Sequence, residues 1–205
     1  MKLYGSPGSP FARKVRIVIA EKNISCEYIV ARGRAPGSPI PPFNPLAKVP
    51  TLVRDDGRGL YDSAVIVEYL DAIGSGPKLI PEDFEQRIEV KRWEALGDGI
   101  TEATVNINHE YREPADKQRS AEWFANQQLK IDRGLAVMER DLGANEYCCC
   151  SRYTLADIAA GYALGYLDFA LPEFEWRGKH PALAKLAGHL ASRPAFSNTV
   201  QFKPV

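Results

Sequence analysis

The sequence predicts an α/β domain followed by an all-helical domain, in a chain of 205 residues. Short strand-like and helix-like patterns alternate in the first 80 residues, whereas residues 82–193 carry almost only helical periodicity. Glycines and prolines punctuate residues 74–81, between the two patterns. We therefore expect an α/β domain and an all-helical domain, with the boundary near residue 80.

The composition is that of an ordinary soluble globular protein. The chain holds 26 Lys and Arg against 26 Asp and Glu, and 45% of its residues are hydrophobic. Nucleic-acid binders need clustered basic residues to displace counterions from phosphates, so this neutral balance predicts no nucleic-acid partner. No apolar run reaches the ~18 residues of a membrane span, and a Gly/Pro/Ser turn comes too early for a secretory signal. We expect a cytoplasmic protein with no membrane partner.

The cysteines point to neither a disulfide framework nor a metal site. In the cytoplasm the thiols of Cys26, Cys148, Cys149 and Cys150 should be reduced. The chain has no Cys-x-x-Cys pair, and none of its three histidines is spaced as a chelating pair, so no metal is expected. Neighbouring cysteines do not easily close a disulfide. We expect at least two of the three consecutive cysteines to be inert loop or core residues.

The first domain should contain the order strand, helix, strand, then strand, strand, helix. A strand at Lys2–Tyr4 precedes a helix that begins after Ser9 and Pro10, the favoured residue types at the N-cap and at the first helical position. Repeated prolines keep residues 31–48 irregular, as a functional loop or as a connector. The first helix should reach Lys22, and the remaining elements are strands at 26–30, 51–53 and 60–61 and a helix at 64–73.

The second domain should contain a hairpin of long helices around a buried central helix. Residues 158–171 are apolar on nearly every face, which is typical of a helix at the centre of a domain. Gly97 and Gly99 are expected kink positions in the first long helix. The helices are expected from Asp83, capped with the help of Gln86, to about Arg112, from about Asp116 to Leu142, from Thr154 to Leu171 and from Pro181 to Ser192.

Three local patterns each allow a structural and a chemical interpretation. Ser9 is a helix cap, and its hydroxyl would also lie at the positive helix end, where an anionic sulfur or oxygen is stabilised. Asp62 and Ser63 begin another helix, or hold the ammonium and carboxylate groups of an amino-acid ligand. Val49-Pro50 enters a strand in the ordinary trans form, or in a cis form that leaves the Val49 backbone to pair with an extended peptide. The residues alone leave these alternatives open.

Taken in order, these residues resemble the motifs of the serine-type cytosolic glutathione transferases over almost the whole chain. Ser9-Pro10-Phe11 resembles the serine active-site motif, and Asn44–Leu52 resembles the loop that ends in a cis-proline and binds glutathione. Asp62-Ser63 is similar to the pair that holds the γ-glutamyl group. Thr154–Asp157 is similar to the capping box of the family's core helix. With Ala95–Ile100, the pattern is most similar to a bacterial subgroup.

The resemblance implies a thioredoxin-like first domain at residues 1–76, a linker at 77–81 and an all-helical domain at 82–205. It also implies a homodimer, with glutathione as co-substrate. Ser9 would donate a hydrogen bond to the glutathione sulfur, whose thiol pKa of about 8.5 would fall by about two pH units, or about 2.7 kcal/mol. The thiolate would then attack a small, apolar electrophile. Because position 9 is Ser and not Cys, a mixed disulfide is not available there and thiol transfer is disfavoured. The alternatives are a non-catalytic binding or regulatory protein on this scaffold, and a glutathione-dependent peroxidase or lyase.

The resemblance also implies the residues around the two ligands. Val49 would pair through its backbone with the cysteinyl unit, and Lys48 would meet the glycyl carboxylate. Asp98 would reach the ligand amine of the partner subunit. The implied glutathione-binding residues are Arg32, Arg34, Lys48, Val49, Pro50, Asp62, Ser63 and Asp98, and the electrophile site would be lined by Ser6, Pro7, Phe11, Asn108, His109, Tyr111 and Arg112.

Overall fold

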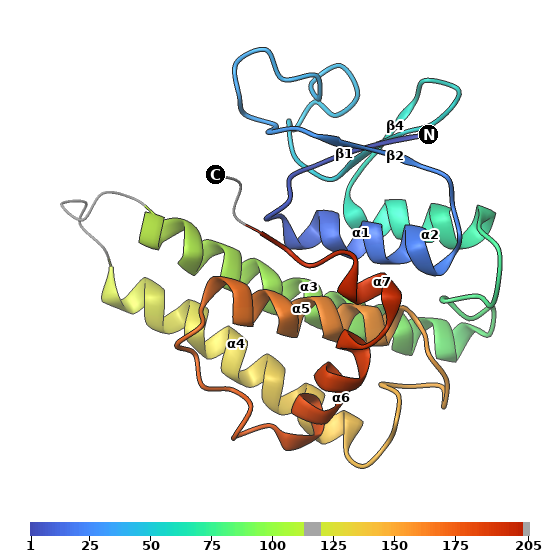
Figure 1. Cartoon of the computed structure of the whole chain (residues 1–205). Coiled ribbons are helices and arrows are strands. Elements are labelled where there is room, and N and C mark those ends of the chain that lie inside the picture. Colours follow the sequence, from blue (N-terminus) through green and yellow to red (C-terminus); the bar gives the residue numbers. More distant parts are fainter. Residues whose placement is uncertain (113–119, 203–205) are drawn as a thin grey trace. The chain divides into compact units, whose positions relative to one another are not determined.

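The computed structural model describes residues 1–112 and 120–202 (Figure 1). Its contacts divide the chain into two compact units, each of which is described by itself. The first unit contains Met1–Ile80 together with the described residues from Ser192 onward, and the second contains Pro81–Ala191. The sequence-based division gave all of residues 82–205 to the helical domain, so the structure moves the last described segment to the first unit.

The first unit is built on a four-stranded mixed sheet whose order is β2-β1-β3-β4. β1 pairs in parallel with β2 and antiparallel with β3, and β3 pairs antiparallel with β4. This is the thioredoxin-like order that the resemblance implied, so that expectation is confirmed. The elements are β1 (Lys2–Gly5), α1 (Pro10–Glu21), β2 (Glu27–Val30), β3 (Thr51–Val53), β4 (Gly59–Leu60) and α2 (Ser63–Ile73), with α1 and α2 on one side of the sheet (Figure 1).

The proline-rich stretch between β2 and β3 packs on the sheet. Ile40 is 0% exposed and forms an apolar cluster with Tyr4, Ala31 and Val53. Phe43 stacks on Tyr4 with ring centroids 6.0 Å apart. The stretch is irregular, as its prolines predicted. It is nevertheless held against the sheet, because its residues supply half of this small core.

A buried ion pair joins α1 to α2. Lys22 Nζ lies 3.0 Å from Asp71 Oδ1, and the two side chains are 1% and 5% exposed. The Asp71 carboxylate also accepts hydrogen bonds from the backbone N–H groups of Leu79 and Ile80, at 2.9 and 3.0 Å. Lys22 donates in turn to the carbonyl of Pro77, at 2.9 Å. The segment that the sequence predicted as a linker is thereby fastened to the first unit.

The last described segment returns to α1. A short helix that the sequence analysis did not predict, α7 (Pro194–Ser197), packs against α1. Just before it, Arg193 forms an ion pair with Glu21 at 2.9 Å. Further on, the buried Arg13 donates a hydrogen bond to Gln201 Oε1, at 3.0 Å. Arg13 and Glu21 thus give α1 two charged side chains that meet the end of the chain.

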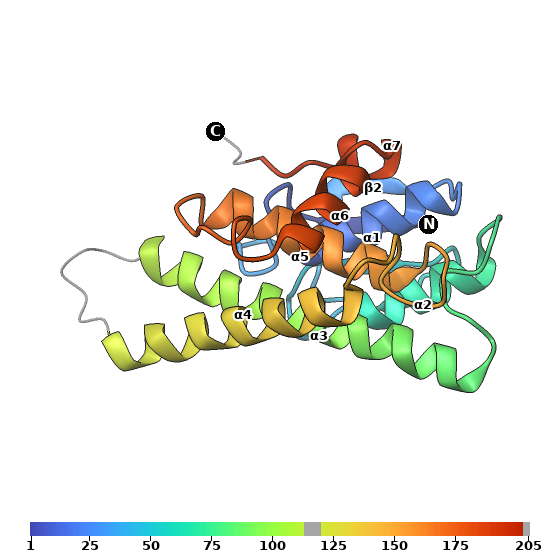
Figure 2. The same cartoon turned by 90° about the horizontal axis from the view of Figure 1, so that it is seen from below.

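In the second unit, α3 and α4 run antiparallel as a hairpin of long helices, and α5 packs on α3 (Figure 2). Most of α5 is buried, as its apolar sequence predicted, and its N-terminus carries the predicted capping box of Thr154 and Asp157. The predicted helix start near Asp116 lies outside the described residues, and Ser120 caps α4. None of the described helices is both long and apolar enough to cross a membrane. The helices are α3 (Phe84–Arg112), α4 (Ala121–Leu142), α5 (Leu155–Ala170) and α6 (Pro181–Ala191).

Gly97 allows α3 and α5 to approach each other closely. A Cβ atom at Gly97 would lie 2.7 Å from the carbonyl oxygen of Ala159, closer than side chains tolerate. At Gly99, two residues further along α3, a Cβ atom would meet nothing within 4 Å. The helix is unbroken through both positions, so close helix packing, and not the expected kink, accounts for Gly97.

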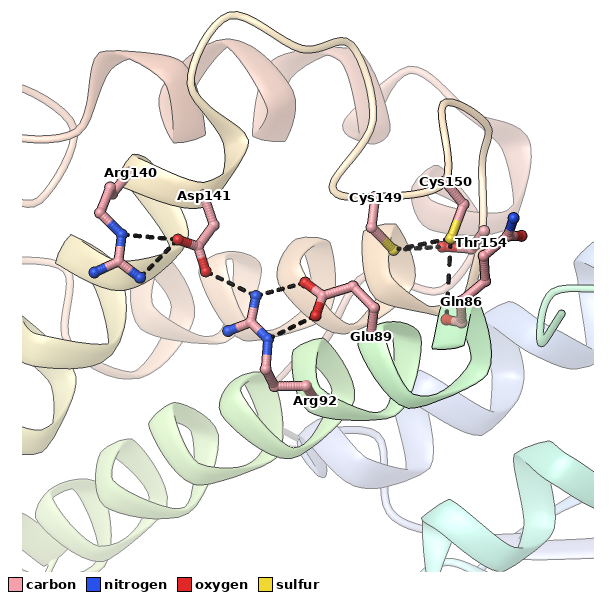
Figure 3. Close-up of polar contacts among 8 residues, drawn as sticks. All are labelled: Gln86, Glu89, Arg92, Arg140, Asp141, Cys149, Cys150 and Thr154. Atoms are coloured by element: carbon pink, nitrogen blue, oxygen red, sulfur yellow. Dashed lines mark hydrogen bonds and ion pairs between the residues drawn. The ribbon is translucent and has the colours of Figure 1, made fainter. Parts of the chain in front are cut away.

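Arg92 links the two helices of the hairpin (Figure 3). Its guanidinium donates to Glu89 on α3, at 2.6 and 2.9 Å, and to Asp141 on α4, at 2.7 Å. The hydrogen bond from Arg92 is the main reason that the pKa of Glu89 lies below its ordinary value. This network is partly exposed, so it is screened by solvent and salt.

Candidate functional site

Ser9 lies where the chain turns from β1 into α1. It has extended backbone angles (φ −77°, ψ 121°), and its Oγ accepts a hydrogen bond from the Ala12 N–H at 3.2 Å, so the predicted cap is confirmed. Its own N–H donates to the carbonyl of Ser6 at 3.0 Å and closes the preceding turn. Within the described residues, the Ser9 hydroxyl hydrogen has no acceptor. The group is therefore able to donate to an anion at the positive end of the helix.

The Val49–Pro50 peptide bond is cis, the form that the resemblance implied. Buried Asn44 donates from Nδ2 to the carbonyl of Lys48, at 3.1 Å, and to Thr51 Oγ1, at 3.0 Å. Thr51 Oγ1 donates to the same Lys48 carbonyl, at 2.8 Å. Over residues 1–112 and 120–202, neither the N–H nor the C=O of Val49 has a hydrogen-bond partner. The loop of residues 44–51, here called the cis-proline loop, thus presents an unpaired backbone unit, as an added strand requires.

Sequence reasoning missed the residues that shape the cis-proline loop. Asn44 Oδ1 also accepts a hydrogen bond from the N–H of Leu46, at 3.0 Å, so one side chain organises both ends of the turn. A Cβ atom at Gly33 would lie 1.7 Å from the carbonyl oxygen of Ala47, so only glycine permits the proline-rich stretch to lie against this loop. The Asn-Pro dipeptide is a turn signal that would have drawn attention to Asn44, whereas nothing local marks Gly33.

Asp62 and Ser63 form the start of α2. Asp62 Oδ1 accepts a hydrogen bond from the Ala64 N–H at 3.1 Å, so the predicted cap is present, and the side chain is exposed. The Tyr61–Asp62 peptide bond is also cis. Ser63 is 4% exposed, and its hydroxyl makes no hydrogen bond to the part of the chain that the structure describes. One carboxylate oxygen of Asp62 therefore caps α2. The other oxygen and the neighbouring Ser63 hydroxyl remain available to a ligand.

The strand register brings these three segments to one end of the sheet. Tyr4 near the end of β1 pairs with Thr51 at the start of β3, and Leu52 pairs with Leu60 at the end of β4. The chain therefore leaves β1 toward Ser9, enters β3 from the cis-proline loop and leaves β4 toward the α2 cap at the same end (Figure 1). Segments that are distant in sequence thus meet around the N-terminus of α1.

The basic residues of the expected site lie on exposed loops in this unit. β2 ends beside the end of β1, with Val30 paired to Gly5, so the loop that carries Arg32 and Arg34 starts at the same end of the sheet. Lys48 lies in the cis-proline loop. All three basic side chains are exposed, and none has an ion-pair or hydrogen-bond partner among the described residues. They leave positive charge available for a carboxylate.

Two of the expected ligand-site residues in the helical unit are engaged with its own packing. The hydroxyl of buried Tyr162 donates a hydrogen bond to Asp98. Asn108 is 7% exposed, and its Nδ2 donates to the hydroxyl oxygen of Tyr166, at 3.1 Å. Asp98 is thus not the fully solvated carboxylate that its helix position suggested, and Asn108 belongs to the interior of its own unit.

The other residues expected at the electrophile site fall into two groups. Ser6, Pro7 and Phe11 lie in the first unit, around the turn that leads into α1. Tyr111 on α3 lines a cavity of about 720 Å³ in the second unit, whereas His109 and Arg112 are exposed and do not line it. Tyr111 stacks on Phe124 of α4, and the cavity is lined by Ile107, Tyr111, Ala121, Phe124, Gln128, Ala170, Leu171, Pro172, Glu173 and Phe174.

Comparisons with known proteins agree with the geometry of the first unit. The family described as "Glutathione S-transferase, N-terminal domain" matches residues 3–78, and "Glutathione S-transferase, C-terminal domain" matches residues 121–197. The chain is 37% identical to the GST-like protein YibF of Escherichia coli K12, over 97% of this chain and 98% of YibF.

Solved structures of similar chains contain glutathione. A glutathione S-transferase from Methylobacillus flagellatus KT, solved with glutathione bound, is 42% identical with a TM-score of 0.93, over 98% of this chain and 99% of that one. A glutathione transferase family member from Pseudomonas fluorescens Pf-5, also with bound glutathione, is 36% identical with a TM-score of 0.86, over 100% of this chain and 99% of that one.

Proposed function

Because the chain belongs to the glutathione S-transferase family, we propose that it is an enzyme that binds glutathione and uses Ser9 to stabilise the glutathione thiolate for attack on a small electrophile. The observation that carries this proposal is the Ser9 hydroxyl, a donor with no acceptor in the described chain, at the N-terminus of α1. A charge-assisted hydrogen bond and the helix dipole both favour the thiolate over the thiol.

In the proposed complex, glutathione lies as an extended peptide across the end of the sheet. The unpaired N–H and C=O of Val49 exchange hydrogen bonds with the cysteinyl unit. The unused carboxylate oxygen of Asp62 pairs with the γ-glutamyl ammonium, and the Ser63 hydroxyl donates to the γ-glutamyl carboxylate. Lys48, with Arg32 or Arg34, faces the glycyl carboxylate. The ammonium and the glycyl carboxylate then each face an opposite charge, and the γ-glutamyl carboxylate accepts a hydrogen bond.

The proposed reaction forms one carbon–sulfur bond. The thiol proton leaves to solvent when glutathione binds, and the thiolate electron pair attacks the electrophilic carbon while a leaving group departs or a double bond takes up the electrons. Ser9 only donates a hydrogen bond, so no covalent enzyme intermediate forms. The acceptor is proposed to be small and apolar, as the resemblance implies.

Calorimetry and a substrate panel test this function. We expect glutathione to bind at millimolar concentration or below, and conjugation of an activated aryl halide to require Ser9. If no heat of binding is detected at millimolar glutathione, the enzyme proposal fails and a non-catalytic binding or regulatory role is favoured. If only hydroperoxides are turned over, the protein is a glutathione-dependent peroxidase, and the conjugation step is wrong.

We also propose a cytoplasmic homodimer. Exposed large apolar side chains in both units support self-association, among them Leu46 (63% exposed), Val65 (49%), Phe84 (68%) and Ile88 (49%). Light scattering of the full chain tests the dimer, and Phe84→Glu with Leu46→Glu is expected to shift the mass to that of one chain. A monomeric mass for the unsubstituted protein at micromolar concentration would contradict this part of the proposal.

A further inference from the structure

Two neighbouring thiols lie side by side in the segment that joins α4 to α5 (Figure 3). The Sγ atoms of Cys149 and Cys150 are 3.6 Å apart, and both residues are partly exposed. Cys149 Sγ lies 3.9 Å from Thr154 Oγ1, and Cys150 Sγ lies 4.0 Å from the carbonyl oxygen of Gln86. Both sulfurs therefore face the same side of the chain, within reach of a single bridging atom.

The backbone fixes this arrangement from both sides. Cys150 and Ser151 have φ angles of +59° and +51°, in the left-handed region, so the neighbouring side chains do not alternate as they would in an extended segment. On one side, the Cys148 N–H donates to Asp157 Oδ1 at 2.9 Å. On the other side, the Thr154 N–H donates to Asp157 Oδ2 at 2.8 Å. The capping box of α5 thus holds the segment that carries the thiols.

The geometry favours an inserted atom over a direct disulfide. Neighbouring Cα atoms are about 3.8 Å apart, below the separation of about 4.4 Å at which disulfides ordinarily begin. The sulfurs would also have to approach from 3.6 Å to about 2 Å. A central atom that bonds two sulfurs at about 2.3 Å with a tetrahedral angle keeps them about 3.8 Å apart. A pyramidal centre with a narrower angle fits the observed spacing of Cys149 and Cys150 still better.

The surroundings favour a neutral reagent over a metal cation. Burial is the largest cause that raises the pKa of Cys149 to about 12, so this thiol is protonated at neutral pH. A divalent cation would have to displace both protons and find further ligands. The described residues contain no group of three or more His, Cys, Asp or Glu side chains that could hold a metal ion. A reagent that condenses with two thiols, releases their protons in water and brings its own third substituent meets both conditions.

We propose that Cys149 and Cys150 form a chelating site for trivalent arsenicals. In the condensation of an aryl dihydroxyarsine, two As–O bonds break and two As–S bonds form. Each thiol proton leaves with one hydroxide as water, so two water molecules are released and arsenic remains trivalent. No oxidant or reductant is required. The site is independent of glutathione binding, since it lies within the second unit and uses none of the residues proposed for that ligand.

Phenylarsine oxide is the probe, added to the full chain without glutathione and followed by intact-protein mass spectrometry. We expect one adduct per chain that survives an excess of a monothiol and is removed by a dithiol. Because chelation by linked groups strengthens binding by about 10²–10⁴-fold, Cys149→Ser and Cys150→Ser should each weaken binding at least about 100-fold. Cys26→Ser, which removes a partly exposed thiol of the first unit, should leave binding unchanged.

Circular dichroism and thermal unfolding identify variants that fail to fold. Should Cys149→Ser not fold, Cys150→Ser still decides the question, because either substitution alone removes one of the two sulfurs. Adduct formation with equal affinity in Cys150→Ser and in the unsubstituted chain would overturn the proposal. So would an adduct that is lost only in Cys26→Ser, or the absence of any dithiol-sensitive adduct.

Discussion

Replacing Ser9 by glycine isolates the hydroxyl from the cap. The Ser9 Oγ accepts one hydrogen bond from Ala12, at 3.2 Å, and glycine at an N-cap costs only a few tenths of a kcal/mol, whereas alanine costs about 1 kcal/mol. Ser9→Gly therefore leaves α1 folded and removes the proposed donor to sulfur. Ser9→Thr keeps a hydroxyl and a favourable cap, and is the matched control.

The expected size follows from the energy of a hydrogen bond to a charged group. Such a bond contributes about 1.5–3 kcal/mol, and about 2 kcal/mol corresponds to a rise of about 1.5 pH units in the pKa of the bound glutathione thiol. If Ser9 and the helix hold that pKa near 6.5, as the estimate of about two pH units implies, the thiolate fraction at pH 7 falls from about three quarters to about one tenth. Conjugation at pH 7 should slow about eightfold and recover as the pH rises.

The assay is a titration of the ultraviolet absorbance of the thiolate in the glutathione complex. Calorimetry should show that Ser9→Gly still binds glutathione, because the backbone of Val49 and the side chains of Asp62 and Ser63 are unchanged. The reasoning is refuted if the bound thiol of Ser9→Gly titrates at the same pH as that of the unsubstituted protein, with both complexes saturated.

Three further predictions concern stability, each measured by urea unfolding. Gly97→Ala should cost about 1–3 kcal/mol because its Cβ meets backbone, whereas Gly99→Ala should be neutral or stabilising by up to about 1 kcal/mol; equal effects would contradict the packing argument. Asp71→Leu leaves Lys22 buried without its carboxylate and should cost about 3–5 kcal/mol; Lys22→Met should recover part of the loss, since the N–H groups of Leu79 and Ile80 still lack the carboxylate. Arg92 lowers the pKa of Glu89, so its contribution of about 0.3–1 kcal/mol should be complete above about pH 4.3 and disappear as pH falls through the lowered value. In Arg92→Gln this acid-dependent loss should be absent, and an unchanged pH profile would show that the network adds nothing.

The parts of the fold that obey local rules could be predicted from the sequence. Ser9 with Pro10, Asp62 and the Thr154 capping box each signal a helix start through the residue itself and its close neighbours, and each cap is present. The strand order followed from the resemblance together with short apolar runs. The helix caps and the strand order both depend on information that lies within a few residues or within a recognisable motif.

Features that depend on distant contacts could not be predicted in this way. Nothing near Lys22 signals that its partner is Asp71, and nothing near Gly33 shows that another loop passes against it. In the candidate site, motifs indicated Ser9 and Val49, but the buried Asn44 that fixes the cis-proline loop emerged only from three-dimensional hydrogen bonding. Such residues act through position, which composition and periodicity do not encode.

The return of the last segment to α1 has a consequence for biosynthesis. The ribosome makes the sheet and α1 first, but the residues from Ser192 onward that complete this unit emerge after the entire second unit has been translated. Arg13 obtains its Gln201 acceptor only after the whole second unit has been made. Completion of the first unit is thus coupled to translation of the second unit, and a nascent fragment released before Ser192 lacks part of the first unit.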